Sequence, residues 1–135
     1  MTQEEKDLLL KDLCARLPYG IKAFYYEAEE ERETWDEIEC VTLDGYVDIG
    51  QYSLPIERIK PCLFPLSSMT EEQYNEFFSY YHNIEMAEVK SSGDYLKAAY
   101  ISDDAKYSWL NSHHFDYRGL IEKGLAIDAT GLNIY

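Results

Sequence analysis

The stretch Ile38-Glu-Cys-Val-Thr-Leu-Asp-Gly-Tyr-Val-Asp-Ile-Gly-Gln-Tyr52 decides the fold class of this chain. Its two arms, 38–43 and 46–52, are rich in β-branched and aromatic residues, a composition that favours strands. The Asp44-Gly45 dipeptide between them is typical of a two-residue hairpin turn, in which both central residues adopt positive φ. Residues 21–27 have a similar strand-like composition. The sequence therefore predicts a small antiparallel β-meander of two or three strands.

Helices are predicted before and after this meander. Thr2 and Glu5 match a capping box, and apolar residues then recur at the spacing of one helical face, so a helix is expected over 3–17. Thr70 and Gln73 match a second capping box, which precedes a stripe of aromatic residues at helical spacing. The side chains expected to be mostly buried are Leu9, Leu13, Leu17, Phe24, Ile38, Val47, Ile59, Phe77, Phe78, Trp109, Leu110, Leu120 and Ile121.

Two short helices are predicted near the C-terminus. Ser102 precedes two aspartates and is a good helix start, and this helix should end near residue 112. Asp116 is placed to cap a second helix over 117–123, and Gly124 is placed to end it. Together these patterns predict an α+β fold, in which a small antiparallel β-meander packs with an N-terminal helix and C-terminal helices.

Composition sets the broad class of the protein. The chain has 135 residues, of which 46% are hydrophobic, so we expect one folded domain over 1–135. No apolar run approaches the roughly 20 residues of a membrane helix, and the acidic start is unlike a secretory signal. We therefore expect a cytoplasmic protein that does not bind membranes. The widely spaced Cys14, Cys40 and Cys62 predict reduced, buried thiols rather than disulfides or a zinc site.

Negative charge is concentrated in one segment. The chain has 26 acidic and 12 basic residues and a net charge of −14, which disfavours direct nucleic-acid binding. Residues 24–52 contain ten acids and one base, Arg32, so they carry 10 − 1 = 9 of these negative charges. Runs of like charge usually form solvated loops. The other interpretations are a contact surface for a basic partner and, as a minor option, a cation site.

A non-enzymatic protein-interaction module is the function that we expect. Its contact surface would be the acidic hairpin over 27–39, and its partner would be a basic protein. If 27–33 were one extended strand, alternate glutamates would project from one face about 7 Å apart. That spacing resembles successive phosphates, so nucleic-acid mimicry is one form of this hypothesis. The candidate interaction residues are Glu27, Glu29, Glu30, Glu31, Glu33, Asp36, Glu37, Tyr117 and Arg118.

The alternative function is an enzyme or a metal-binding protein that uses His113, His114 and Asp116. Neighbouring residues on a helix point about 100° apart, so the two histidines cannot face one ion and a further ligand must come from elsewhere. A structural interpretation competes with this one: a histidine at a helix C-terminus and an aspartate that caps the next helix. The sequence has no phosphate-binding glycine loop, and we expect no cofactor.

Three blocks of sequence resemble an uncharacterised conserved protein family of Bacteroides genomes, their prophages and other mobile elements. The blocks are Ala15-Arg-Leu-Pro-Tyr-Gly20, 59–73 and 109–126, and they are spread from one end of the chain to the other. The resemblance implies a bacterial or phage origin. It supplies no activity and no catalytic residues.

Overall fold

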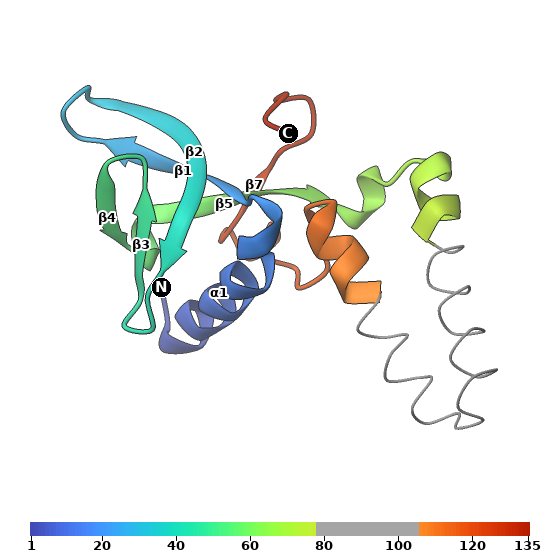
Figure 1. The fold of residues 1–135 in the computed structure, drawn as a ribbon, viewed down its shortest axis with the longest axis horizontal. Coiled ribbons are helices and arrows are strands. Elements are labelled where there is room, and N and C mark those ends of the chain that lie inside the picture. Colours follow the sequence, from blue (N-terminus) through green and yellow to red (C-terminus); the bar gives the residue numbers. More distant parts are fainter. Residues whose placement is uncertain (78–105) are drawn as a thin grey trace.

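A computed structural model describes residues 1–77 and 106–135 of the chain. It shows an α+β fold with an N-terminal helix, a mostly antiparallel sheet and short helical segments at 71–77 and 106–112 (Figure 1). The predicted fold class is confirmed. No helix in these two described parts is both long and apolar enough to cross a membrane.

In the described residues the sheet has seven strands in the order β4-β3-β2-β1-β5-β6, and β7 also pairs with β5. The long strand β2 bends at an irregularity between Ile38 and Cys40, so its first half pairs with β1 and its second half with β3. Both β6 and β7 run parallel to β5, whereas the other pairs between described strands are antiparallel. The strands are β1 (Lys22–Glu27), β2 (Arg32–Val41), β3 (Tyr46–Ile49), β4 (Tyr52–Pro55), β5 (Ile59–Pro65), β6 (Phe115–Asp116) and β7 (Ile127–Asp128).

The loop at Asp44-Gly45 differs from the predicted two-residue turn. The Thr42 amide donates to the Tyr46 carbonyl at 2.9 Å, and the Gly45 amide donates to the Thr42 carbonyl at 3.1 Å. Within this loop positive φ occurs at Gly45 and not at Asp44. These features fit a three-residue loop that ends on a left-handed glycine, the other common hairpin connection for Asp-Gly sequences.

The tight two-residue turn lies instead at Gly50-Gln51. Ile49 and Tyr52 are paired across it, so the predicted single strand over 46–52 is in fact the hairpin of β3 and β4. Gly50 has a φ of 61°, which the first central position of such a turn favours. A Cβ atom at Gly50 would approach the Tyr25 hydroxyl to 2.6 Å, so both the conformation and the space require glycine here.

The predicted N-terminal helix is confirmed as α1 (Gln3–Arg16), which begins with the Thr2–Glu5 capping box. It continues into the short 3-10 helix η1 (Leu17–Tyr19), which Gly20 ends at a φ of 73°. The buried face of α1 differs from the expected leucine stripe. It combines two leucines with two charged residues, and these four are Leu9, Asp12, Leu13 and Arg16.

The segments after β4 are a mixture of confirmed and corrected predictions. A 3-10 helix, η2 (Ile56–Arg58), follows Pro55, and a further one, η3 (Leu66–Ser68), follows β5. The Thr70–Gln73 capping box is formed. Residues 117–123 form turns rather than the predicted helix. The predictions for Phe78 and for a helix start at Ser102 lie outside the described residues.

Most of the predicted core is buried. The main cluster joins α1, the sheet and the C-terminal segment, and a second cluster surrounds Trp109 and Phe115. Leu17, Phe24, Phe77 and Ile121 are half-buried. The expectation that all three cysteines are buried is wrong, because only Cys62 is buried and the other two are exposed.

Candidate functional site

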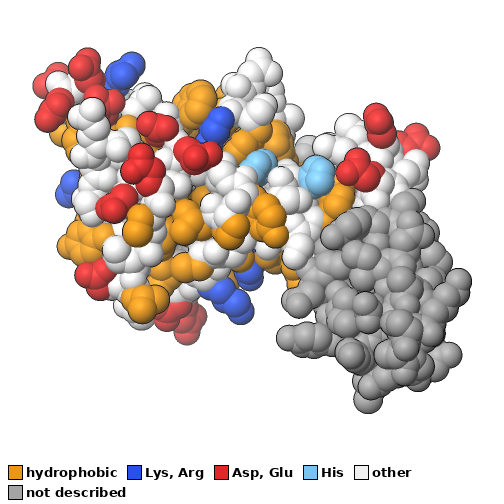
Figure 2. All heavy atoms as spheres, in the orientation of Figure 1, with side chains coloured by type: hydrophobic (Ala, Val, Ile, Leu, Met, Phe, Trp, Pro, Cys, Tyr) orange, Lys and Arg blue, Asp and Glu red, His pale blue; other side chains and the backbone are white. Residues whose placement is uncertain are grey.

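The acidic segment forms the turn of the β1–β2 hairpin and most of strand β2. Seven of the eight acidic side chains over 27–39 are exposed, and Figure 2 shows acidic side chains gathered around the projecting end of this hairpin. The remaining one, Glu27, is half-buried and lies 3.7 Å from Arg32. In the part of the chain that the structure describes, it is the only acid of this segment in an ion pair.

The phosphate-like row of glutamates is not formed. Residues 28–31 make the turn between β1 and β2, and Glu31 has a left-handed φ of 52°. Glu27 and Glu33 therefore lie on opposite strands, where they are one residue away from direct pairing. The condition for such a row, one extended strand over 27–33, is not met because residues 28–31 reverse the chain.

The outer face of the hairpin, which we define by Lys22, Phe24 and Tyr26 of β1 and the residues opposite them, is aromatic as well as acidic. In the β1–β2 register, Tyr26 lies opposite Glu33 and Phe24 lies opposite Trp35, and directly opposed side chains share a face of the sheet. Trp35 is 41% exposed and Tyr26 is 57% exposed. The other face of β1 contributes to the main core.

An ammonium group already occupies part of this outer face. Lys22 Nζ lies 5.1 Å from the centre of the Trp35 ring and 5.5 Å from that of Tyr135, and it donates to the Ile134 carbonyl at 2.8 Å. Cations within about 6 Å of an aromatic ring are attracted to its negative face. The outer face is therefore chemically suited to amines and guanidinium groups.

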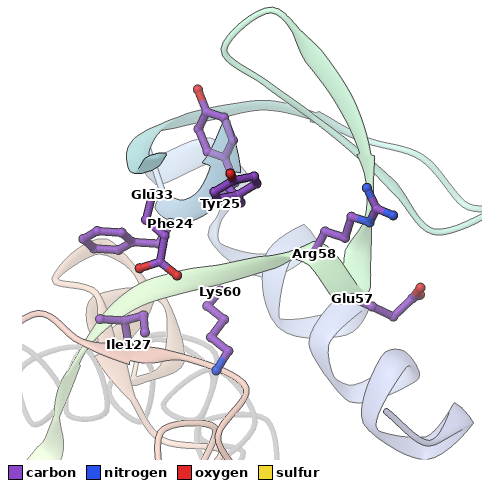
Figure 3. A pocket seen from close by; sticks show the side chains of 8 residues that line it. Phe24, Tyr25, Glu33, Glu57, Arg58, Lys60 and Ile127 are labelled. Carbon is purple, nitrogen blue, oxygen red and sulfur yellow. The ribbon is translucent and has the colours of Figure 1, made fainter. Parts of the chain in front are cut away.

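A hollow of about 390 Å³ lies beside this surface, at the junction of β1, β5 and η2. Figure 3 shows Phe24 and Glu33 towards one end of the hollow, Glu57 and Arg58 at the other, and Lys60 between them. Its two acids and two bases balance each other. The excess negative charge consequently belongs to the hairpin and not to the hollow.

A second polar group lies between α1 and the C-terminal segment. Asp12 is fully buried and accepts hydrogen bonds from Arg16 Nε at 2.9 Å and from Arg118 Nε at 3.0 Å. Arg16 is also fully buried and donates to the Phe115 carbonyl at 2.6 Å. Burial raises the pKa of Asp12, while the two guanidinium groups oppose that shift. Both guanidinium groups flank the Tyr117 ring, at 5.2 and 4.8 Å.

The two adjacent histidines face different neighbours. The His113 ring stacks on Trp109 at 3.9 Å between ring centres, and its Nδ1 lies 2.9 Å from the Trp109 carbonyl oxygen. The His114 ring stacks on Tyr135 at 3.7 Å, and burial lowers the pKa of His114 to about 4. The predicted alternative needs these rings to converge in one pocket, and they do not.

The Asp116 side chain forms hydrogen bonds with backbone amides. Its carboxylate accepts from the amides of Arg118, Leu120 and Ile121 at 3.2, 3.0 and 2.9 Å. It therefore binds turn amides in the segment 117–123, where the helix that it was predicted to cap is not formed. Among residues 1–77 and 106–135, no group of three or more His, Cys, Asp or Glu side chains could hold a metal ion. The described residues thus do not assemble the alternative metal site.

Of the predicted interaction residues, Tyr117 and Arg118 meet each other but lie with Asp12 rather than on the hairpin outer face. Sequence reasoning missed Asp12 and Arg16. The available signal was their four-residue spacing, which places opposite charges next to each other on the helix face that also carries Leu9 and Leu13.

Comparison with family models, curated proteins and solved structures finds no match to the chain. The resemblance to the Bacteroides family stays a prediction.

Proposed function

We propose that this protein is a non-enzymatic interaction module whose acidic hairpin, 27–39, binds a basic segment of a partner protein. The observation that carries the proposal is the exposed Trp35, which lies in β2 between Glu33 and Glu37 on the outer face. Side chains two residues apart on a strand are about 7 Å apart on one face. A lysine or arginine of the partner would meet both a ring face and a carboxylate.

Charge supports the same partner. The hairpin has eight acids and one base, a net charge of 1 − 8 = −7. Such a surface speeds encounter with a basic partner and disfavours acidic ones. Lys22 already lies over one face of Trp35 at 5.1 Å, so a cation of the partner would contact the exposed remainder of Trp35 or the exposed Tyr26 ring. Each such contact contributes about 0.5–1 kcal/mol at an exposed site. Because the phosphate-like row is not formed, the proposal names a basic protein and not a mimic of nucleic acid.

Titration of the full chain with a lysine- and arginine-rich peptide tests the proposal. Tryptophan fluorescence reports on binding of the peptide near Trp35, since Trp35 is 41% exposed whereas Trp109 is only 5% exposed. We expect saturable binding that weakens steeply between about 0.1 and 1 M salt, because the screening length falls from about 10 to about 3 Å. A glutamate-rich peptide should not bind.

Matched charge reversals distinguish the contribution of the hairpin to binding from that of the net charge of the protein. Glu33→Lys with Glu37→Lys should weaken binding at least about tenfold, through lost attraction to a cationic peptide. Glu72→Lys with Glu122→Lys changes the net charge by the same amount at exposed positions elsewhere and should cost less than about threefold. Equal losses in the two variants, or affinity that ignores salt, would refute the proposal.

A further inference from the structure

A pocket of about 520 Å³ lies between α1 and the C-terminal segment, and among the residues that line it are Lys11, Asn111, Tyr117 and Arg118. It is separate from the acidic hairpin and from both histidine rings. We propose that this pocket binds the carboxylate or phosphoryl group of a small anionic ligand.

The direction of the hydrogen bonds in the pocket wall is fixed by a guanidinium group. Arg118 Nη2 donates to the Tyr117 hydroxyl at 3.0 Å, and a guanidinium group has no acceptor. The Tyr117 hydroxyl therefore accepts from Arg118 and donates its own proton to Asn111 Oδ1, at 2.9 Å. This arrangement orients the Asn111 amide so that its oxygen is occupied and its nitrogen remains available.

Three donor groups at the pocket remain available to a ligand. Within the described residues, Arg118 Nη1, Asn111 Nδ2 and the Lys11 ammonium group have no hydrogen-bond partner. Both carboxylate oxygens of Asp12 are used by the two arginines. The hydroxyl groups of Tyr107 and Ser108 also line the pocket, and each can donate as well as accept. Because two of the available donors are cationic, the pocket favours an oxyanion over a cation.

The charge of the side chains that line the pocket also favours an anionic ligand. Of the residues that line the pocket, two are cationic, Lys11 and Arg118, and none is acidic, in a chain whose net charge is −14. The buried Asp12 behind them pairs with both Arg16 and Arg118. Arg16 Nη1 is buried without a hydrogen-bond partner in the described residues. The pocket is therefore a local positive site on an acidic protein.

Calorimetric titration of the full chain with inorganic phosphate and with succinate, at constant ionic strength and with chloride as the reference anion, tests this site. We expect saturable binding of at least one probe. Tighter binding of phosphate assigns a phosphoryl ligand, and tighter binding of succinate assigns a carboxylate. Failure of both probes to bind more tightly than chloride overturns the proposal.

Two variants locate the binding. Lys11 is exposed, so Lys11→Glu should fold normally and weaken binding by about tenfold or more, the effect of losing one charge-assisted hydrogen bond. Lys60→Glu makes the same charge change on β5 and should alter binding by less than about twofold. Arg118→Lys keeps the charge beside Asp12 but removes Nη1, and should also weaken binding. Equal affinity in Lys11→Glu and Lys60→Glu would overturn the proposal.

Discussion

Replacing Asp12 with asparagine removes the carboxylate that binds two guanidinium groups. Arg16 and Asp12 are both fully buried, and Arg16 Nε lies 2.9 Å from the carboxylate. The guanidinium group stays protonated at any pH at which the protein folds, so the variant leaves a buried positive charge without its counter-ion. Asparagine has nearly the same shape as aspartate, and the substitution therefore tests charge rather than packing.

The expected cost follows from the burial of the pair. Breaking a buried ion pair by removing one partner typically costs about 3–5 kcal/mol. Asparagine keeps one acceptor oxygen, so we expect Asp12→Asn to lower the free energy of unfolding by about 3 kcal/mol, the lower end of that range. The second arginine, Arg118, is 17% exposed at its side chain and can turn towards water, so it adds little to the loss.

Urea denaturation followed by circular dichroism measures the effect. With an m value of about 1–3 kcal/mol/M, a loss of 3 kcal/mol shifts the midpoint by at least about 1 M. Asp7→Asn, an exposed acid of the same helix, should stay within about 0.5 kcal/mol of the natural protein. Adding Arg16→Met to Asp12→Asn should recover part of the loss. A cost below about 1 kcal/mol for Asp12→Asn would refute the electrostatic reasoning.

Three further predictions follow from the buried groups and the turns. Burial lowers the pKa of His114 from its ordinary value of 6.5 to about 4. Between these two pH values the unfolded chain binds more protons than the folded one, so the free energy of unfolding falls as the pH drops. His114→Asn should flatten this pH dependence in urea titrations at pH 4 to 7, and an unchanged slope would contradict the prediction. Burial raises the pKa of Cys62 to about 12, so a disulfide reagent should modify only the exposed Cys14 and Cys40 in the native protein and should reach Cys62 after unfolding. Rapid reaction of all three thiols would show instead that Cys62 is accessible. Gly50→Ala should cost about 1–3 kcal/mol more than Gly131→Ala, because both have positive φ but only Gly50 would place its Cβ against Tyr25; equal thermal shifts would count against this.

The elements that could be predicted depend on neighbours in the sequence. The helix α1, its capping box and the Thr70–Gln73 box were predictable because the hydrogen bonds that define them join residues three or four apart. Strand composition located β1 and the end of β2. The hairpin turn was misplaced because Asp44-Gly45 and Gly50-Gln51 both suit tight turns, and strand pairing decides between them.

The candidate sites were predicted less well than the elements. The acidic segment was identified by charge alone, but the aromatic residues that share its outer face follow from the β1–β2 register. His113 and His114 were considered together because they are adjacent, yet they stack on Trp109 and Tyr135 respectively. Adjacency in the sequence does not bring two side chains to one ligand.

By itself the sequence determined the α+β class, the N-terminal helix and the concentration of negative charge, because these follow from local periodicity and composition. The tertiary structure alone decided which face of α1 is buried. Asp12 can be buried because Arg118, 106 residues further along the chain, donates to it together with Arg16. A buried charge is tolerated only with its partners in place, and no local pattern shows where a partner so distant in sequence will lie.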